Sequence, residues 1–179
     1  MVEIVWLKKD LRVADHEALW RAAGTGNGVV VVFVYEREVM EAGDFSGRHF
    51  LFQEECLREV DEELRKLGGE LVTRVGVVEE VFEGLRGELG EVRLWSHEET
   101  GNGVTYARDL RVKAWAEERE VDWVECLQTG VVRRLEERDG WSGRWAKRMG
   151  REVLGLPEGV RFVEVKGEGI LEKERFGIE

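Results

Sequence analysis

The sequence lacks the features of a disulfide-stabilised or membrane-spanning protein. Its 179 residues include only two cysteines, too few for a disulfide scaffold, and a single proline. The longest apolar run, residues 29–35, is far shorter than the roughly 20 residues that a membrane-spanning helix needs. The amino-terminal segment carries an acid where a signal peptide has basic residues. We therefore expect a cytoplasmic protein with no membrane partner.

Positive charge is also scarce. The chain has 38 acidic residues against 27 lysines and arginines, and its net charge is -11. Such a surface repels a phosphate backbone at long range, so we expect no direct binding to nucleic acid. The densest basic stretch is also interrupted by acids. Its basic residues are Arg133, Arg134, Arg138, Arg144, Lys147, Arg148 and Arg151.

The sequence does contain a regular alternation of short apolar runs and segments with helical periodicity. Each of five apolar runs is followed by a helix-length segment, which indicates βαβ units and a mainly parallel sheet. We therefore predict an α/β fold, a three-layer, doubly wound, Rossmann-like domain with five parallel strands. The predicted strands span residues 2–7, 29–35, 71–75, 92–95 and 121–126, and the predicted helices span residues 16–23, 47–67, 78–89 and 105–118.

Polar residues indicate where these helices begin and end. Asp15 is the expected N-cap of the first helix and Ser46 that of the long second helix, which ends at Gly68-Gly69. A polar loop is expected over residues 36–45.

Beyond Gln128 the pattern weakens. A short helix over residues 142–151 would place Trp141 and Trp145 on one face, and a strand is predicted over residues 160–165. We expect this tail either to be poorly ordered or to fold back on the sheet.

Three motifs, at residues 4–15, 96–103 and 106–109, resemble the N-terminal domain of the photolyase/cryptochrome family. The usual first motif there is Trp-Phe-Arg-x-Asp-Leu-Arg. Trp6 and Asp10-Leu11-Arg12 match it, whereas Leu7-Lys8 differ. Residues 130–141 are similar to a bacterial cryptochrome-like branch of that family.

The resemblance implies a domain over residues 1–130, with strand order 3-2-1-4-5, and a connector-like tail over residues 131–179. In the family this connector leads to a helical domain that binds flavin, and that domain is absent from this chain. FAD would then be bound only with a helical domain supplied elsewhere, so a helical flavin-domain partner in trans is one expectation. An apolar face near Trp141, Trp145 and Val153-Leu154 is also expected, which would be covered either in a homodimer or by the tail in a monomer.

Ligands of open parallel sheets bind beyond the carboxyl ends of the strands, where the strand order reverses. With the implied order, residues 8–12 and 97–101 meet at that point. Asp10 and Arg12 either present a fork to a ligand, or Arg12 pairs with a neighbouring acid and fixes the turn. The sequence has neither a dinucleotide-binding glycine motif nor a P-loop, and no cluster with metal-ligand spacing. Residues 98–103 are therefore interpreted as a pocket rim.

In family members with a light-harvesting chromophore, an arginine at the start of the long helix and residues after the fourth strand line its pocket. The resemblance thus implies contacts from Phe33, Tyr35, Arg48, Glu99 and Arg108. Members with a folate antenna carry Asn-Glu just before the Ala-Arg-Asp triplet, where this chain has Val104-Thr105. A deazaflavin or flavin antenna is therefore favoured over folate. The alternatives are an empty pocket and a solvated charged rim.

The implied function is light-driven repair of pyrimidine dimers in DNA or blue-light sensing. The sequence offers no convergent acid, base and nucleophile, so we expect no catalysis, including photo-lyase activity, from this chain alone. The alternative is a stand-alone module with the same fold that binds a nucleotide or another protein.

Overall fold

The computed structural model describes residues 1–133, 135 and 137–178. Its centre is a parallel sheet in the order β3-β2-β1-β4-β5, which confirms the predicted fold and strand order. Valine-rich segments form the middle of the sheet because β-branched side chains suit a strand buried on both faces. The strands are β1 (Val2–Leu7), β2 (Gly28–Tyr35), β3 (Leu71–Val75), β4 (Val92–His97) and β5 (Trp123–Cys126).

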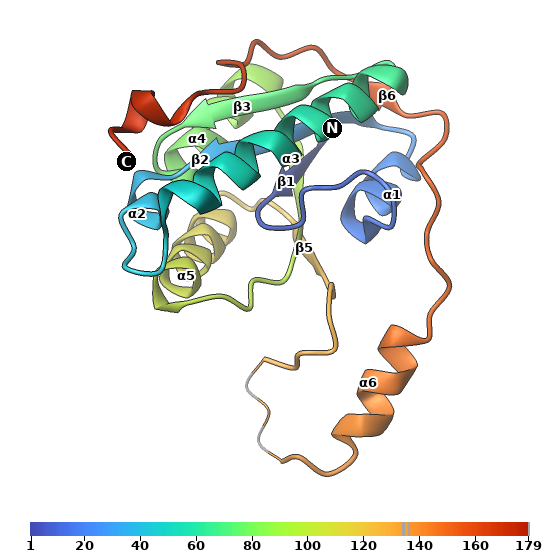
Figure 1. Cartoon of the computed structure of the whole chain (residues 1–179). Coiled ribbons are helices and arrows are strands. Elements are labelled where there is room, and N and C mark those ends of the chain that lie inside the picture. The colour runs from blue at the N-terminus through green and yellow to red at the C-terminus, as the bar shows by residue number, and fades with distance from the viewer. Residues whose placement is uncertain (134, 136, 179) are drawn as a thin grey trace.

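Helices cover both faces of this sheet and create two hydrophobic cores (Figure 1). Helices α1 (Glu17–Ala23) and α3 (Gly47–Lys66) pack on one face, and α4 (Val78–Leu89) and α5 (Gly103–Glu118) pack on the other. Successive side chains of a strand point to opposite faces. Val31 therefore belongs to the core under α1 and α3, and Val32 to the core under α4 and α5.

Two local predictions were wrong. The N-cap of α1 is His16, whose Nδ1 accepts a hydrogen bond from the backbone N–H of Leu19 at 3.0 Å, and Asp15 takes a positive φ of 51°. His16 takes the N-cap position in place of Asp15 because its ring is fully buried beside Asp10. The predicted loop over residues 36–45 contains a short helix, α2 (Arg37–Met40).

The tail folds back on the sheet, which is the second of the two expectations. Strand β6 (Arg161–Phe162) pairs in parallel with Gly28 and Val29 of β2. A Cβ on residue 69 would lie only 2.4 Å from the ring of Phe162, so only glycine at position 69 leaves room for that ring. A 3-10 helix, η1 (Lys173–Phe176), then places Phe176 against Tyr35, with ring centroids 5.4 Å apart.

Between the sheet and this tail, the chain leaves the domain over residues 127–156, here called the excursion (Figure 1). It carries α6 (Trp141–Met149), close to the predicted short helix. It rejoins the domain where Asp15 N–H donates to the carbonyl of Leu154 at 2.9 Å. Arg134, part of the basic stretch, lies outside the described residues. Among the described residues, no helix has the length and apolar character needed to cross a membrane.

Candidate functional site

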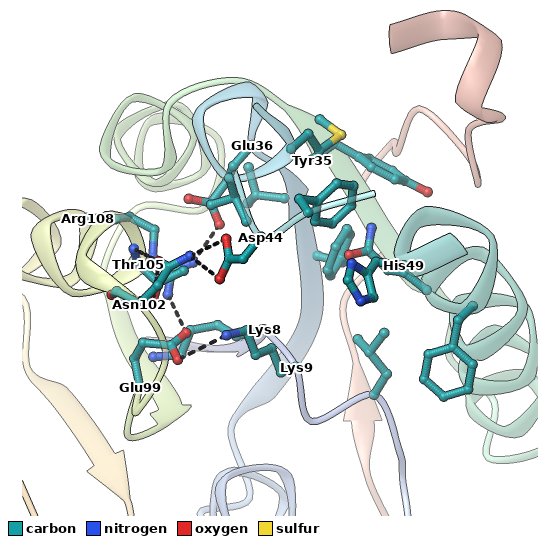
Figure 2. Close-up of a pocket in the computed structure, with 18 residues that line it drawn as sticks. Lys8, Lys9, Tyr35, Glu36, Asp44, His49, Glu99, Asn102, Thr105 and Arg108 are labelled. Carbon is teal, nitrogen blue, oxygen red and sulfur yellow. Dashed lines mark hydrogen bonds and ion pairs between the residues drawn. The ribbon is translucent and has the colours of Figure 1, made fainter. Parts of the chain in front are cut away.

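A cavity of about 310 Å³ opens at the carboxyl ends of β1, β2 and β4, where the strand order reverses (Figure 2). Each of these strands runs directly into a segment that supplies part of the wall, and α2, α3 and α5 supply the rest. The residues that line it are Lys8, Lys9, Leu11, Phe33, Val34, Tyr35, Glu36, Val39, Met40, Asp44, Phe45, His49, Phe52, Gln53, Glu99, Asn102, Thr105 and Arg108.

Arg108 of α5 is the centre of a buried ionic network on one side of this cavity (Figure 2). Its guanidinium donates to Glu36 at 2.8 Å, to Glu99 at 3.0 Å and to Asp109 at 2.9 Å. Burial raises the pKa of Glu36 to about 7, although Arg108 opposes that shift. Because its donors are engaged by three carboxylates, Arg108 shapes the wall more than it offers a free contact to a ligand.

Two lysines extend this network from the end of β1. The Lys8 ammonium is buried 3.1 Å from Asp109 and 4.6 Å from the centre of the Trp6 ring, and burial lowers its pKa. Lys9 is exposed at the mouth, with Nζ 3.7 Å from Glu99. Near Lys9, the Asn102 amide donates to both carboxylate oxygens of Asp44 at 2.8 and 2.9 Å. The mouth therefore has a cation beside a hydrogen-bonded bridge between two loops.

A second buried polar cluster joins β1, α1 and β4. Asp10 Oδ2 lies 2.8 Å from His16 Nε2 and 2.5 Å from His97 Nδ1, and Asp10 Oδ1 accepts from the backbone N–H of Lys8 at 2.8 Å. Hydrogen bonds from both histidines hold the pKa of Asp10 well below its usual value against the effect of burial, and burial lowers the pKa of His16. The cluster thus fastens the turn after β1 to the end of β4.

These three side chains are also a group that could hold a metal ion, a combination that sequence spacing did not reveal. Their ligand atoms come from three separate segments and lie within 4.8 Å of one another. The separations of 2.8 and 2.5 Å between Asp10 and the two histidines are hydrogen-bond lengths. We therefore interpret the cluster as a structural triad, held by the hydrogen bond between His97 and Asp10 and by the close polar contact of His16 Nε2 with the same carboxylate oxygen.

The residues proposed from sequence divide into two groups. Phe33, Tyr35, Glu99 and Arg108 line the cavity. Asp10, in contrast, is buried in the triad and does not line the cavity.

Arg12 and Arg48 also lie outside the cavity wall. Arg12 donates from Nε and Nη2 to the backbone carbonyl of Asp15 at 3.2 and 2.9 Å. It therefore fixes the turn, which was the second interpretation from the sequence. The acceptor is the backbone carbonyl of Asp15 and not its carboxylate. Arg48 is exposed and His49 lines the cavity in its place, because each helical residue turns by about 100° from the one before.

Several residues of the wall were not proposed from sequence. Some had a usable signal: Glu36 follows β2 directly, and Lys8 follows β1 directly, at the edge where ligands of parallel sheets bind. Others come from α2 and the loop after it, a region that sequence predicted as a plain loop. These residues are Val39, Met40, Asp44 and Phe45.

A parallel, doubly wound sheet with a cleft at its switch point defines a class of α/β ligand-binding domains. Residues 3–138 match the sequence profile of the DNA photolyase family. The chain therefore belongs to the DNA photolyase family, as its motifs indicated.

Two curated relatives show the extent of the similarity. The chain is 31% identical over 111 residues to a deoxyribodipyrimidine photo-lyase of Agrobacterium fabrum, a match that covers 62% of this chain and 22% of that protein. It is 33% identical over 117 residues to a cryptochrome DASH of Gloeobacter violaceus, covering 60% of this chain and 23% of the relative. The match thus spans about a fifth of each relative's length.

Solved structures share the fold. A class III photolyase from Agrobacterium tumefaciens superposes with a TM-score of 0.77 at 24% identity, over 94% of this chain and 37% of that one. An archaeal photolyase from Sulfolobus tokodaii, described with two FAD molecules and a novel light-harvesting cofactor, has a TM-score of 0.72 at 19% identity, over 98% and 41%. At these identities the likeness establishes the fold alone.

Proposed function

We propose that this chain is the chromophore-binding α/β domain of a photolyase- or cryptochrome-type protein. The cavity would hold a flavin or deazaflavin that gathers light for DNA repair or for blue-light sensing. The observation that supports the proposal is the cavity itself, about 310 Å³ in volume at the switch point of the sheet. The light-driven reaction would need a helical domain with FAD, supplied as a partner in trans.

The chemistry of the cavity wall favours a planar aromatic ligand. Phe33 and Tyr35 form an edge-to-face pair with ring centroids 5.0 Å apart, and Phe45, Phe52 and Met40 add further apolar surface. At position 105, where the folate-type pattern has Glu, Thr105 instead hydrogen-bonds to the carbonyl of Asn102 at 3.1 Å. These features favour a flavin-type ring over a folate.

The residues of the chain would hold and orient such a ring. The aromatic side chains would bind its faces and exclude water. The Arg108 network would keep α5, the end of β2 and the loop after β4 in fixed positions, because one guanidinium is bonded to carboxylates from all three. The bound chromophore would supply visible absorbance.

The direct test is titration of the protein with riboflavin and with 5-deazariboflavin, followed by ligand fluorescence. We expect saturable 1:1 quenching, because stacking on aromatic side chains quenches such rings. Val39→Trp, which fills the cavity from α2, should weaken binding at least about tenfold. Val131→Trp, at an exposed site outside the cavity, is the matched control and should bind as the parent does. Equal affinity in both variants, or no quenching at millimolar ligand, would contradict the proposal.

We further propose that the exposed face of α6 mediates association, either between two copies of this chain or with the helical partner. Trp141 and Trp145 lie side by side on that face, with ring centroids 6.4 Å apart, and both are exposed. Val153 and Leu156 add apolar surface further along the excursion.

A further inference from the structure

A second crevice, of about 400 Å³, lies between α1 and the returning end of the excursion. It shares no lining residue with the cavity at the switch point. Its walls carry four arginines, an unusual concentration in a chain whose net charge is -11. These arginines are Arg12, Arg21, Arg148 and Arg151.

Three of these guanidiniums converge on one carboxylate, that of Glu17. Arg148 Nη1 donates to Glu17 Oε2 at 3.0 Å, whereas Arg21 and Arg151 approach the same carboxylate only to 3.9 Å. One negative charge therefore faces three positive charges. The wall as a whole carries four arginines against three acids, Asp15, Glu17 and Glu152, and Asp15 also accepts from the backbone N–H of Leu154 at 3.1 Å. The crevice thus keeps a net positive charge in a strongly acidic chain, and an anion is favoured there.

The two more distant arginines retain donors for a ligand, although Arg21 Nη1 also donates to Cys126 Sγ at 3.7 Å and its guanidinium lies 5.2 Å from the centre of the Trp95 ring. A separation of 3.9 Å is too long for a hydrogen bond, so the contacts of Arg21 and Arg151 with Glu17 are electrostatic alone. Their side chains are 45% and 53% exposed, and both line the crevice. A guanidinium carries five N–H donors in a planar fork that matches the oxygens of a phosphate. Arg151 thus presents its fork at the opening, and Arg21 adds the donors that do not contact Cys126.

An aromatic surface lies beside these forks. Trp20, next to Arg21 on α1, lines the crevice and is 47% exposed. An exposed indole is costly to leave in water and is a good platform for a nucleobase, which stacks on it whatever its sequence identity. Arginine forks and an indole at one opening are the combination that a ligand with both a phosphate and an aromatic base requires.

We propose that this crevice is a binding site for a nucleoside phosphate. The guanidiniums of Arg21 and Arg151 bind the phosphate, and the indole of Trp20 stacks on the base. Arg148 has a positioning role, because its bonds to Glu17 and to the carbonyl of Leu127 hold the end of α6 against α1. The site is therefore built from both ends of the excursion as well as from the sheet domain.

Isothermal titration calorimetry at low ionic strength, with AMP, adenosine and inorganic phosphate as separate titrants, tests this proposal. We expect AMP to bind at least about tenfold more tightly than either fragment, since it alone uses both parts of the site. Trp20→Ala should reduce AMP binding to the level of inorganic phosphate. Arg151→Gln should weaken AMP about tenfold, whereas Arg37→Gln, an exposed arginine of α2, should leave it unchanged. Raised salt should weaken binding, because the site is open to solvent.

The variant Glu17→Gln distinguishes a ligand site from a purely structural contact between α6 and α1, here called a latch. The amide oxygen can still accept from Arg148, but the negative charge that competes with a phosphate is gone. A ligand site predicts about tenfold tighter AMP binding in this variant. A latch predicts no gain.

Absence of a saturable AMP signal in both the parent and Glu17→Gln would overturn the proposal, as would unchanged affinity in Arg151→Gln. The circular dichroism spectrum of each variant verifies that it folds. Since riboflavin and 5-deazariboflavin carry no phosphate and the two sites share no residue, failure here leaves the chromophore cavity untouched.

Discussion

The sheet domain buries charged side chains, whereas the excursion exposes large aromatic side chains. In the domain, charged side chains such as Asp10 and Arg108 are each only 2% exposed, and every one of these charges is paired. In the excursion, Trp141 and Trp145 are 38% and 46% exposed although indoles favour burial. The domain also exposes single aromatic side chains, such as Trp20 at 47%, but on α6 two exposed indoles lie next to each other, which is why we propose that face for association.

Removal of the Asp10 carboxylate tests the first half of this comparison and should have the largest effect. Asp10→Ala leaves two buried histidines and the N–H of Lys8 without their acceptor. Loss of one partner in a buried polar cluster costs about 3 to 5 kcal/mol of unfolding free energy. Urea denaturation followed by circular dichroism at pH 7.5 measures the loss.

Asp139→Ala, in the exposed part of the excursion, is the matched control. We expect it to change the unfolding free energy by less than about 0.5 kcal/mol, as most surface substitutions do. Equal effects of the two substitutions would show that the triad does not fasten the domain.

Glu36 provides a second test, through pH. Folding raises its pKa from 4.5 to about 7, mainly by burial, so the folded state holds a proton that the unfolded chain has released between these values. The protonated carboxyl therefore contributes stability below pH 4.5, and this contribution is lost as the pH rises through 7. Glu36→Gln keeps a neutral side chain at every pH. Its stability relative to the parent should increase by about 2 to 3 kcal/mol between pH 4.5 and pH 8.5.

Urea denaturation at both pH values measures the difference in unfolding free energy between Glu36→Gln and the parent protein. All other titratable groups are common to the two proteins, so their contributions cancel in this difference. A stability difference that does not change between the two pH values would mean that Glu36 is ionised in the fold at neutral pH, and would contradict this prediction.

The sequence was sufficient for the sheet because the β-branched runs and the helical periods agree along residues 2–126. The strand order came only with the family resemblance, since periodicity does not encode which strands are neighbours. The cap of α1 could not be predicted: Asp15 is the better N-cap by type, and His16 displaces it through a contact with Asp10 that only the folded chain forms.

The cavity was predictable in position but not in detail. The rule for parallel sheets placed it between β1 and β4 once the family resemblance supplied the strand order. Of the residues that the resemblance implied, Phe33, Tyr35, Glu99 and Arg108 line the cavity. The helical phase decided between Arg48 and His49, and sequence alone does not fix that phase to one residue. The contacts of α2 with the cavity depend on tertiary packing, because a four-residue helix has no sequence period of its own.

The exposed face of α6 provides the last and smallest test. Replacement of Trp141 and Trp145 by serine together should change the unfolding free energy of the domain by less than about 0.5 kcal/mol, because neither indole belongs to the two cores. The same change should shift the protein toward the monomer in sedimentation velocity, because it removes the largest apolar groups of that face. Trp20→Ser, an equally exposed indole on α1, controls for the loss of indole surface in general. A parent protein that sediments as a monomer at every concentration would exclude self-association through this face.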